Sequence, residues 1–239
     1  LMAHTEIKEN TDKLTLQLNG GGPVGSLVSV VKLNGKKAII KGYIQNPNIN
    51  FTTENNEKVD IKTAVGNSGY LNFIKDNIYT KFGYKGLSQL VSGDINDDFA
   101  YYYKTSSQKL TYLDTDVLIR DNEIIASGGY IINLMPDATP EVLNQIETAI
   151  NKSPSVIELL NQNKSLEEIS KILTDDENIE LIDNELSVVY ECDCSKEKIE
   201  KGIISLGKEE LEDIIHTEEK IETVCQFCNK KYEFRSWKT

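Results

Sequence analysis

The chain has 239 residues, of which 39 % are hydrophobic and 27 % are charged. This composition allows a buried core in one medium-sized domain with a smaller appendage, and it excludes global disorder. No apolar run approaches the roughly 18 residues that cross a bilayer, and the start shows no export signal, so we expect a soluble protein without a membrane partner.

The formal net charge of −12 is concentrated in the last third of the sequence. Residues 1–154 carry 17 acidic and 15 basic side chains, a net of −2, whereas residues 155–239 carry 21 acidic and 11 basic side chains, a net of −10. Binding to nucleic-acid phosphates requires charge of the opposite sign. The sequence therefore predicts that nucleic acid is not a partner.

The first half of the sequence is typical of strands joined by turns. "KLTLQLN" alternates apolar and polar residues, and a longer strand-like stretch follows with Asn34-Gly35 at a hairpin position. The glycines within residues 20–25 match the G-x-G-x-x-G pattern of phosphate-binding loops. Because a β-branched strand rather than a helix follows them, and Pro23 interrupts the loop, a plain turn is favoured.

An acidic stretch and a long helix complete the first domain. Residues 94–98 suggest a calcium loop, but the glycine and glutamate that such a loop needs are missing, so capping of a helix is favoured. Two further strands follow, with Asp121-Asn122 as the turn between them. A helix is predicted to begin at Thr139-Pro140. We expect an α+β domain closed by this helix.

The sequence pattern changes at Ser153. From there, two short predicted helices with strongly charged outer faces follow each other. The second has a capping box from Ser165 to Glu168. Short helices of this kind are marginal in isolation, so we interpret them as a linker that is folded only while docked. The residues predicted to be buried are Val156, Ile157, Leu159, Leu160, Leu166, Ile169, Ile172 and Leu173.

All four cysteines lie near the end of the chain, as Cys192-x-Cys194 and Cys225-x-x-Cys228. A strand precedes the first pair, two predicted helices separate the pairs, and the second pair lies in a strand–knuckle–strand stretch. Four thiolates in this pattern can converge on one zinc ion. A bare dithiol and an iron–sulfur cluster are less favoured, because the C-x-x-C does not open a helix and the spacings are not those of recognisable clusters. We interpret Phe227 as packing beside the metal.

The energetics indicate what the zinc does. The segment around the cysteines is too small to be stabilised by its own core. Zinc binding at such sites contributes roughly 10–16 kcal/mol, whereas a whole domain is stable by about 5–15 kcal/mol. Oxidation of the thiolates ejects the metal, so the arrangement can act as a redox switch. Paired cysteines of this type favour a reducing, cytoplasmic location.

The resulting fold class is α+β, in three parts. We expect a β-rich N-terminal domain with flanking helices over residues 1–152, a helical linker over 153–186 and a small C-terminal zinc-binding domain over 187–239. His4 and His216 are the only histidines, and neither has a nucleophile near it in the sequence. The sequence therefore predicts that the protein is not an enzyme.

Several motifs together resemble a known family. They are "GGGPVG", "AVGNSGYLNFIKD", "VSGDINDDFAYYY", "SGGYIINLMPDA", "ECDCS", "LGKEEL" and "VCQFCNKKY", in this order. The chain is similar along nearly its whole length to the bacterial redox-regulated heat-shock chaperones called thirty-three-kilodalton chaperonins. By this resemblance, we expect the chain to lack an N-terminal segment that members of the family carry, which would be a departure from the family pattern.

The resemblance implies a function for the cysteines. Cys192, Cys194, Cys225 and Cys228 would bind one zinc ion in the reduced, inactive state. Oxidative stress together with unfolding conditions would form Cys192–Cys194 and Cys225–Cys228 disulfides, release the zinc and undock the linker. The opened protein would bind unfolded or aggregation-prone client proteins without ATP, and oxidised copies would pair as homodimers. The alternative is a binding protein without a redox response, in which the four-cysteine zinc module is purely structural.

Overall fold

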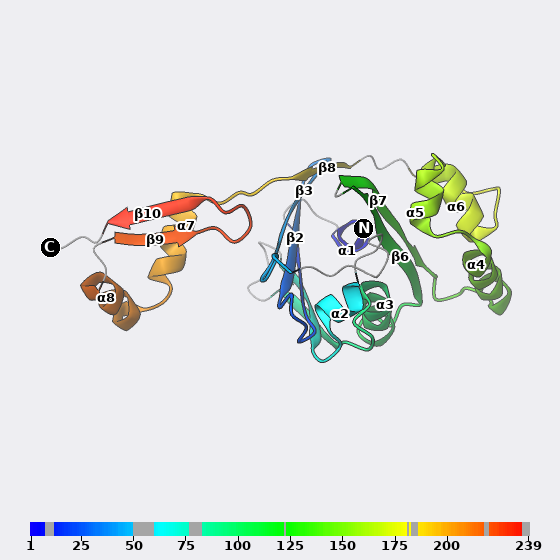
Figure 1. The fold of residues 1–239 in the computed structure, drawn as a ribbon. Coiled ribbons are helices and arrows are strands. Elements are labelled where there is room, and N and C mark those ends of the chain that lie inside the picture. Colours follow the sequence, from blue (N-terminus) through cyan, green and yellow to red (C-terminus); the bar gives the residue numbers. More distant parts are fainter. Residues whose placement is uncertain are drawn as a thin grey trace.

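The computed structural model describes residues 1–7, 12–49, 60–76, 83–121, 123–180, 182, 186–217 and 220–235. A β-rich body occupies the centre, with helices α4 to α6 on one side and a C-terminal unit on the opposite side (Figure 1). Within the described residues no helix is long and apolar enough to cross a membrane. The turn residue Asn122 and the side chains of His4 and His216 lie outside the described part of the chain.

The central body is built on a six-stranded sheet in the order β5-β4-β1-β2-β3-β8. Its strands are β1 (Lys13–Asn19), β2 (Leu27–Asn34), β3 (Lys37–Ile44), β4 (Tyr70–Asp76), β5 (Tyr84–Gln89) and β8 (Ser187–Tyr190). Every neighbouring pair is antiparallel except β3 and β8, which are parallel. Because the glycines within residues 20–25 connect two antiparallel strands, the prediction of a plain turn is confirmed, as is the hairpin at Asn34-Gly35.

One face of the sheet carries the main hydrophobic core. Leu14 and Phe73 are buried there beneath helix α3 (Ile95–Thr105), and the rings of Phe73 and Tyr102 stack with their centroids 4.9 Å apart. Helices α1 (Met2–Glu6) and α2 (Ile61–Val65) also contribute to this core. The sequence did not predict α1, which buries Ala3 against the core.

The acidic stretch at residues 94–98 caps α3, as predicted. Asp94 is the N-cap residue, and its side chain accepts a hydrogen bond from the backbone N–H of Asn96 at 2.9 Å. Asp98 is only 1 % exposed and accepts from the backbone N–H groups of residues 91–93 at 2.7–3.1 Å. These carboxylates therefore satisfy backbone donors of the loop and the helix, as N-terminal caps do.

A separate hairpin connects the body to the helices that follow. Strands β6 (Thr111–Arg120) and β7 (Glu123–Asn133) form this two-stranded antiparallel sheet, and α3 packs against β6. Helix α4 (Pro140–Lys152) begins as predicted, with Thr139 as the N-cap and proline in the first turn. It packs against α6 (Leu166–Thr174), which follows α5 (Val156–Asn161).

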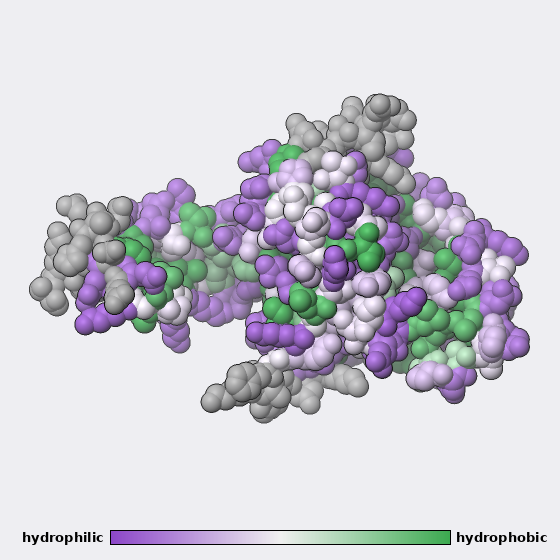
Figure 2. Space-filling view, turned by 90° about the horizontal axis from the view of Figure 1, so that it is seen from below, coloured by the Kyte–Doolittle hydropathy of each residue, from purple (hydrophilic) through white to green (hydrophobic). Residues whose placement is uncertain are grey.

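The C-terminal unit consists of a helical hairpin and a β-hairpin. Helices α7 (Lys196–Ile204) and α8 (Lys208–Thr217) lie between the two cysteine pairs, and β9 (Lys220–Val224) pairs with β10 (Lys231–Arg235), as the sequence predicted. Apolar surface on this unit lies among hydrophilic groups (Figure 2). Ile204 is 60 % exposed, and α7 contains no buried residue. Among the described residues of this unit, only Cys225 and Tyr232 are buried, so the described part has very little hydrophobic core.

Candidate metal centre

The C-x-C arm is positioned by the edge of the central sheet. Strand β8 ends at Tyr190, and the backbone N–H of Glu191 still bonds to the carbonyl of Ile40 in β3 at 3.0 Å. Asp193, between the two cysteines, forms ion pairs with Lys41 of β3 and with Lys198 of α7. The first cysteine pair is therefore held between the sheet and the start of α7.

The C-x-x-C arm is a tight turn between β9 and β10. The backbone N–H of Asn229 donates to the carbonyl of Cys225 at 2.7 Å, and the N–H of Cys225 donates to the carbonyl of Lys230 at 3.0 Å. Asn229 takes a left-handed conformation with φ of 58°, which asparagine tolerates better than most residues. This geometry is the knuckle that the sequence predicted, and it directs both thiols to the same side.

The four thiols meet in one cluster. All four Sγ atoms lie within 4.8 Å of one another. The short distances join the two arms, because Cys192 lies 3.7 Å from Cys225 and Cys194 lies 3.4 Å from Cys228. Zinc–sulfur bonds of about 2.3 Å give a tetrahedron with edges of about 3.8 Å, whereas a disulfide bond measures about 2.05 Å. The cysteines are thus free thiols whose spacing fits a tetrahedral metal ion.

A tyrosine tunes this cluster. The hydroxyl of Tyr232 in β10 donates a hydrogen bond to Cys194 Sγ at 3.0 Å, which lowers the pKa of Cys194 to about 7. Burial raises the pKa of Cys192 to about 12. In the metal-free site, Cys194 therefore ionises more readily than Cys192. The thiolate is the form of cysteine that binds metals and reacts with oxidants. No local signal in the sequence pointed to Tyr232, although it lies four residues after Cys228.

Comparison with known proteins identifies the family. The sequence profile described as Hsp33 protein matches residues 1–235. The chain belongs to the Hsp33 family. This membership confirms the resemblance inferred from the motifs, and the Hsp33 family is a family of chaperones rather than enzymes.

Relatives of this Hsp33 family member are similar over most of their length. A 33 kDa chaperonin of Acetivibrio thermocellus is 41 % identical over 98 % of this chain and 77 % of its own length. One from Caldanaerobacter subterraneus is 40 % identical over 97 % of this chain and 77 % of its own. The crystal structure of the 33 kDa chaperonin from Thermotoga maritima has a TM-score of 0.79 at 27 % identity, covering 95 % of this chain and 76 % of that one. The predicted α+β fold class with a C-terminal cysteine cluster is confirmed.

Helices α5 and α6 of this Hsp33 family member dock onto the β6–β7 hairpin. Leu159 of α5 forms a buried cluster with Ile169 and Leu173 of α6, and Tyr130 and Ile132 of β7 pack against it. Both helices begin with a capping box, the predicted one at Ser165 and a second at Ser155. The predicted burial of Leu166 is wrong: its side chain is 76 % exposed, because the buried cluster does not extend to the first residue of α6.

Two residues of the hairpin fit α5 in particular. A Cβ atom at Gly128 of β7 would lie 2.3 Å from Leu160 Cδ1, so the glycine allows α5 to approach the strand closely. Asp114 of β6 accepts hydrogen bonds from the backbone N–H of Val156 at 3.3 Å and from Asn96 Nδ2 at 3.1 Å. The start of α5 is therefore connected through Asp114 to α3 in the central body.

The knuckle also contacts the sheet. The rings of Phe227 and Tyr43 meet edge to face, with centroids 5.1 Å apart and an interplanar angle of 85°. Lys41 Nζ lies 4.7 Å from the centroid of the Phe227 ring. The Tyr190 hydroxyl donates to the carbonyl of Gly42 at 2.8 Å and lies 3.5 Å from the carbonyl oxygen of Phe227. Phe227 thus packs on β3, a contact that the sequence did not predict.

Proposed function

We propose that this chain is a redox-regulated holdase that binds unfolded proteins without ATP. In the reduced state, Cys192, Cys194, Cys225 and Cys228 hold one zinc ion, and the protein is inactive. Oxidation forms a disulfide within each arm, Cys192–Cys194 and Cys225–Cys228, and the zinc leaves. The observation that carries this proposal is the convergence of four free thiols in a unit whose described residues form very little hydrophobic core.

The geometry explains why oxidation would open the unit. A zinc ion bonded to all four sulfurs ties the C-x-C arm to the C-x-x-C arm. Each of the two disulfides lies within one arm and neither connects the two arms, so the cross-link between the arms is lost. Each disulfide forms as two thiols lose two protons and two electrons to a peroxide, which is reduced to two molecules of water. Because metal binding supplies most of the stability of so small a unit, its loss unfolds the segment.

The opening is proposed to spread to the linker. Residues 1–152 form the client-binding body, 153–186 the linker, and 187–239 the zinc unit, with β8 shared because it pairs with β3. The linker is docked through a small buried cluster, and short helices do not persist without such contacts. Undocking uncovers the apolar surface of β7 and of α5, and exposed apolar surface of this kind binds unfolded chains.

The family name supports this assignment. Relatives are named chaperonins, and the match extends along nearly the whole chain. We further propose that the protein works in the bacterial cytoplasm, where the thiols are kept reduced until stress, and that oxidised copies pair as homodimers through the uncovered surface. A purely structural zinc module without a redox response is not favoured by the family match.

A light-scattering assay tests the proposal. An unfolding test protein is warmed with this chain, either reduced and zinc-loaded or treated with warm peroxide, and aggregation is followed. We expect only the oxidised form to suppress aggregation, with release of one zinc ion per chain measured by a coloured chelator. Equal suppression by both forms would contradict the redox switch and favour the structural zinc module. Suppression by neither form would contradict the holdase function.

A further inference from the structure

The knuckle contacts the sheet mainly through one aromatic side chain, as a bound peptide would, and not through a continuous hydrophobic core. We define the knuckle seat as Lys41, Tyr43, Ile44 and Gln45 at the end of β3. Phe227 lies on it as a single aromatic side chain, edge to face with Tyr43 and beneath the ammonium group of Lys41. The surrounding ion pairs, such as Lys37 with Glu191, are half exposed and contribute little to holding the two parts together.

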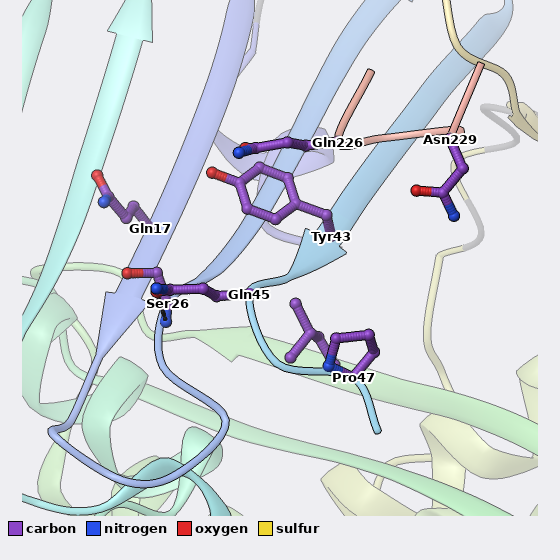
Figure 3. Close-up of a pocket in the computed structure, with 8 residues that line it drawn as sticks. Gln17, Ser26, Tyr43, Gln45, Pro47, Gln226 and Asn229 are labelled. Carbon is purple, nitrogen blue, oxygen red and sulfur yellow. Dashed lines mark hydrogen bonds between the residues drawn. The ribbon is translucent and has the colours of Figure 1, made fainter. Parts of the chain in front are cut away.

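A polar cavity of about 320 Å³ lies beside the seat. Figure 3 shows Tyr43 at its centre, with side chains of the sheet on one side and Gln226 and Asn229 of the knuckle on the other. The sheet side includes Gln17 and Gln45, whose amides carry donors and acceptors, and Gln45 Oε1 already accepts a hydrogen bond from the backbone N–H of Ser26 at 3.1 Å.

We propose that the knuckle seat is a client-binding subsite, and that Phe227 occupies it as an internal substitute for a client while the metal is bound. The ligand is an extended segment of an unfolded protein that carries a phenylalanine. This inference rests on the proposed function, because the seat is vacated only when oxidation releases the knuckle. The seat then presents an aromatic ring, a cation and amide groups together.

The chemistry of the occupant follows from the contacts of Phe227. An aromatic ring gains an edge-to-face contact with Tyr43 and a cation–π contact with Lys41, neither of which an aliphatic side chain can make in full. Lys41 makes this contact while its ammonium is also paired with Asp193, so an incoming ring can use it whether or not that ion pair persists. The cavity provides hydrogen-bonding groups for the polar main chain beside the ring, as unfolded segments require.

The experiment uses a peptide copy of the knuckle as the probe. A fluorescein-labelled peptide with the sequence of residues 223–231, carrying Cys225→Ser and Cys228→Ser, is titrated with full-length protein, and its anisotropy is measured. The control peptide carries Phe227→Ala in addition. The proteins are the wild type in both redox states, zinc-loaded Phe227→Ala, oxidised Tyr43→Ala, and oxidised Tyr70→Ala as the control, because Tyr70 is an exposed tyrosine of β4 in the same sheet.

We expect the phenylalanine peptide to bind the oxidised wild type and zinc-loaded Phe227→Ala, but not the zinc-loaded wild type. Tyr43→Ala should weaken binding about 2- to 10-fold, as loss of one aromatic pair does, and Tyr70→Ala should not. Equal binding of both peptides, or equal binding by Tyr43→Ala and the wild type, would overturn the inference. Should Tyr43→Ala not fold, Lys41→Met compared with Lys37→Met applies the same test.

Light scattering on the same samples distinguishes failure of the knuckle seat from failure of the holdase function. If the oxidised wild type suppresses client aggregation but shows no binding that depends on Tyr43, the knuckle seat is refuted and the holdase function stands. If the peptide binds at the seat but aggregation is not suppressed, the holdase function is refuted. The zinc content of Phe227→Ala must equal that of the wild type. A variant that had lost its metal would vacate the seat because the whole knuckle is released, and not because the ring is missing.

Discussion

Replacing Leu159 by alanine is expected to undock the linker without touching a cysteine. Leu159 is 2 % exposed and packs with Ile169 and Leu173, so alanine leaves a cavity in the centre of the docking cluster. Leu166, at the first position of the next helix, is 76 % exposed. Leu166→Ala is therefore a matched control, with the same chemical change in a neighbouring helix.

The expected magnitude follows from the cost of such cavities. Truncating a fully buried leucine to alanine costs about 3 kcal/mol, whereas exposed substitutions usually stay within about 0.5 kcal/mol. A change of about 3 kcal/mol raises the undocked population of the linker roughly a hundredfold. The zinc-loaded Leu159→Ala variant should therefore suppress client aggregation measurably without oxidation, and the zinc-loaded Leu166→Ala variant should behave as the wild type does.

Hydrogen exchange measures the undocking directly. Peptides that cover residues 156–174 should exchange faster in Leu159→Ala than in Leu166→Ala, while peptides from β1 and β4 should keep their protection. Two results would refute the reasoning. Equal exchange in the two variants would mean that the cluster does not hold the linker, and faster exchange without suppression of aggregation would mean that undocking is not what activates the protein.

Three further changes test other contacts. Gly128→Val should displace Leu160 and speed exchange in α5 as Leu159→Ala does, and unchanged exchange would contradict the close approach of α5 to β7. Tyr232→Phe removes the hydrogen-bond donor that lowers the pKa of Cys194, so in the reduced, metal-free chain this pKa should rise from about 7 towards the usual value of about 8.5. Fewer Cys194 thiolates at pH 7 then mean slower alkylation by iodoacetamide, followed by mass spectrometry, and the difference should vanish well above pH 9; an equal rate at pH 7 would count against the hydrogen bond. Asp98→Ala leaves three backbone N–H groups without their acceptor at a buried position and should cost about 3 kcal/mol of stability in urea unfolding, with unchanged zinc content as the control; a shift below about 1 kcal/mol would contradict this role.

Features with local sequence signals were predicted well. The cap at Asp94, the helix start at Thr139-Pro140 and the box at Ser165 each depend on residues within one turn of the helix. The spacing of Cys225 and Cys228 likewise indicated the knuckle, which the structure closes at Asn229. Such signals need no knowledge of how distant segments meet, because the side chain and the backbone group that it satisfies are close in sequence.

Contacts between distant segments were not predictable in this way. Tyr232 reaches Cys194, and Phe227 reaches Tyr43, only because the fold brings the knuckle against other parts of the chain. Leu166 shows the complementary error. Helical periodicity placed it on the apolar face of α6, but periodicity does not reveal how far along the helix the partner surface extends. Helix α1 was not predicted because its five residues are too few to show a helical period.

The parallel pairing of β8 with β3 fixes the chain at a second point beyond the linker. Residues 134–186 therefore form a closed loop, held at one end by the bond from the Leu134 N–H to the carbonyl of Leu110 and at the other by β8. A segment pinned at both ends gains less entropy on unfolding than a free tail, and it stays at high effective concentration near the surface that it left. As long as β8 stays in place, re-docking after reduction is an intramolecular event, with a rate that does not depend on the protein concentration.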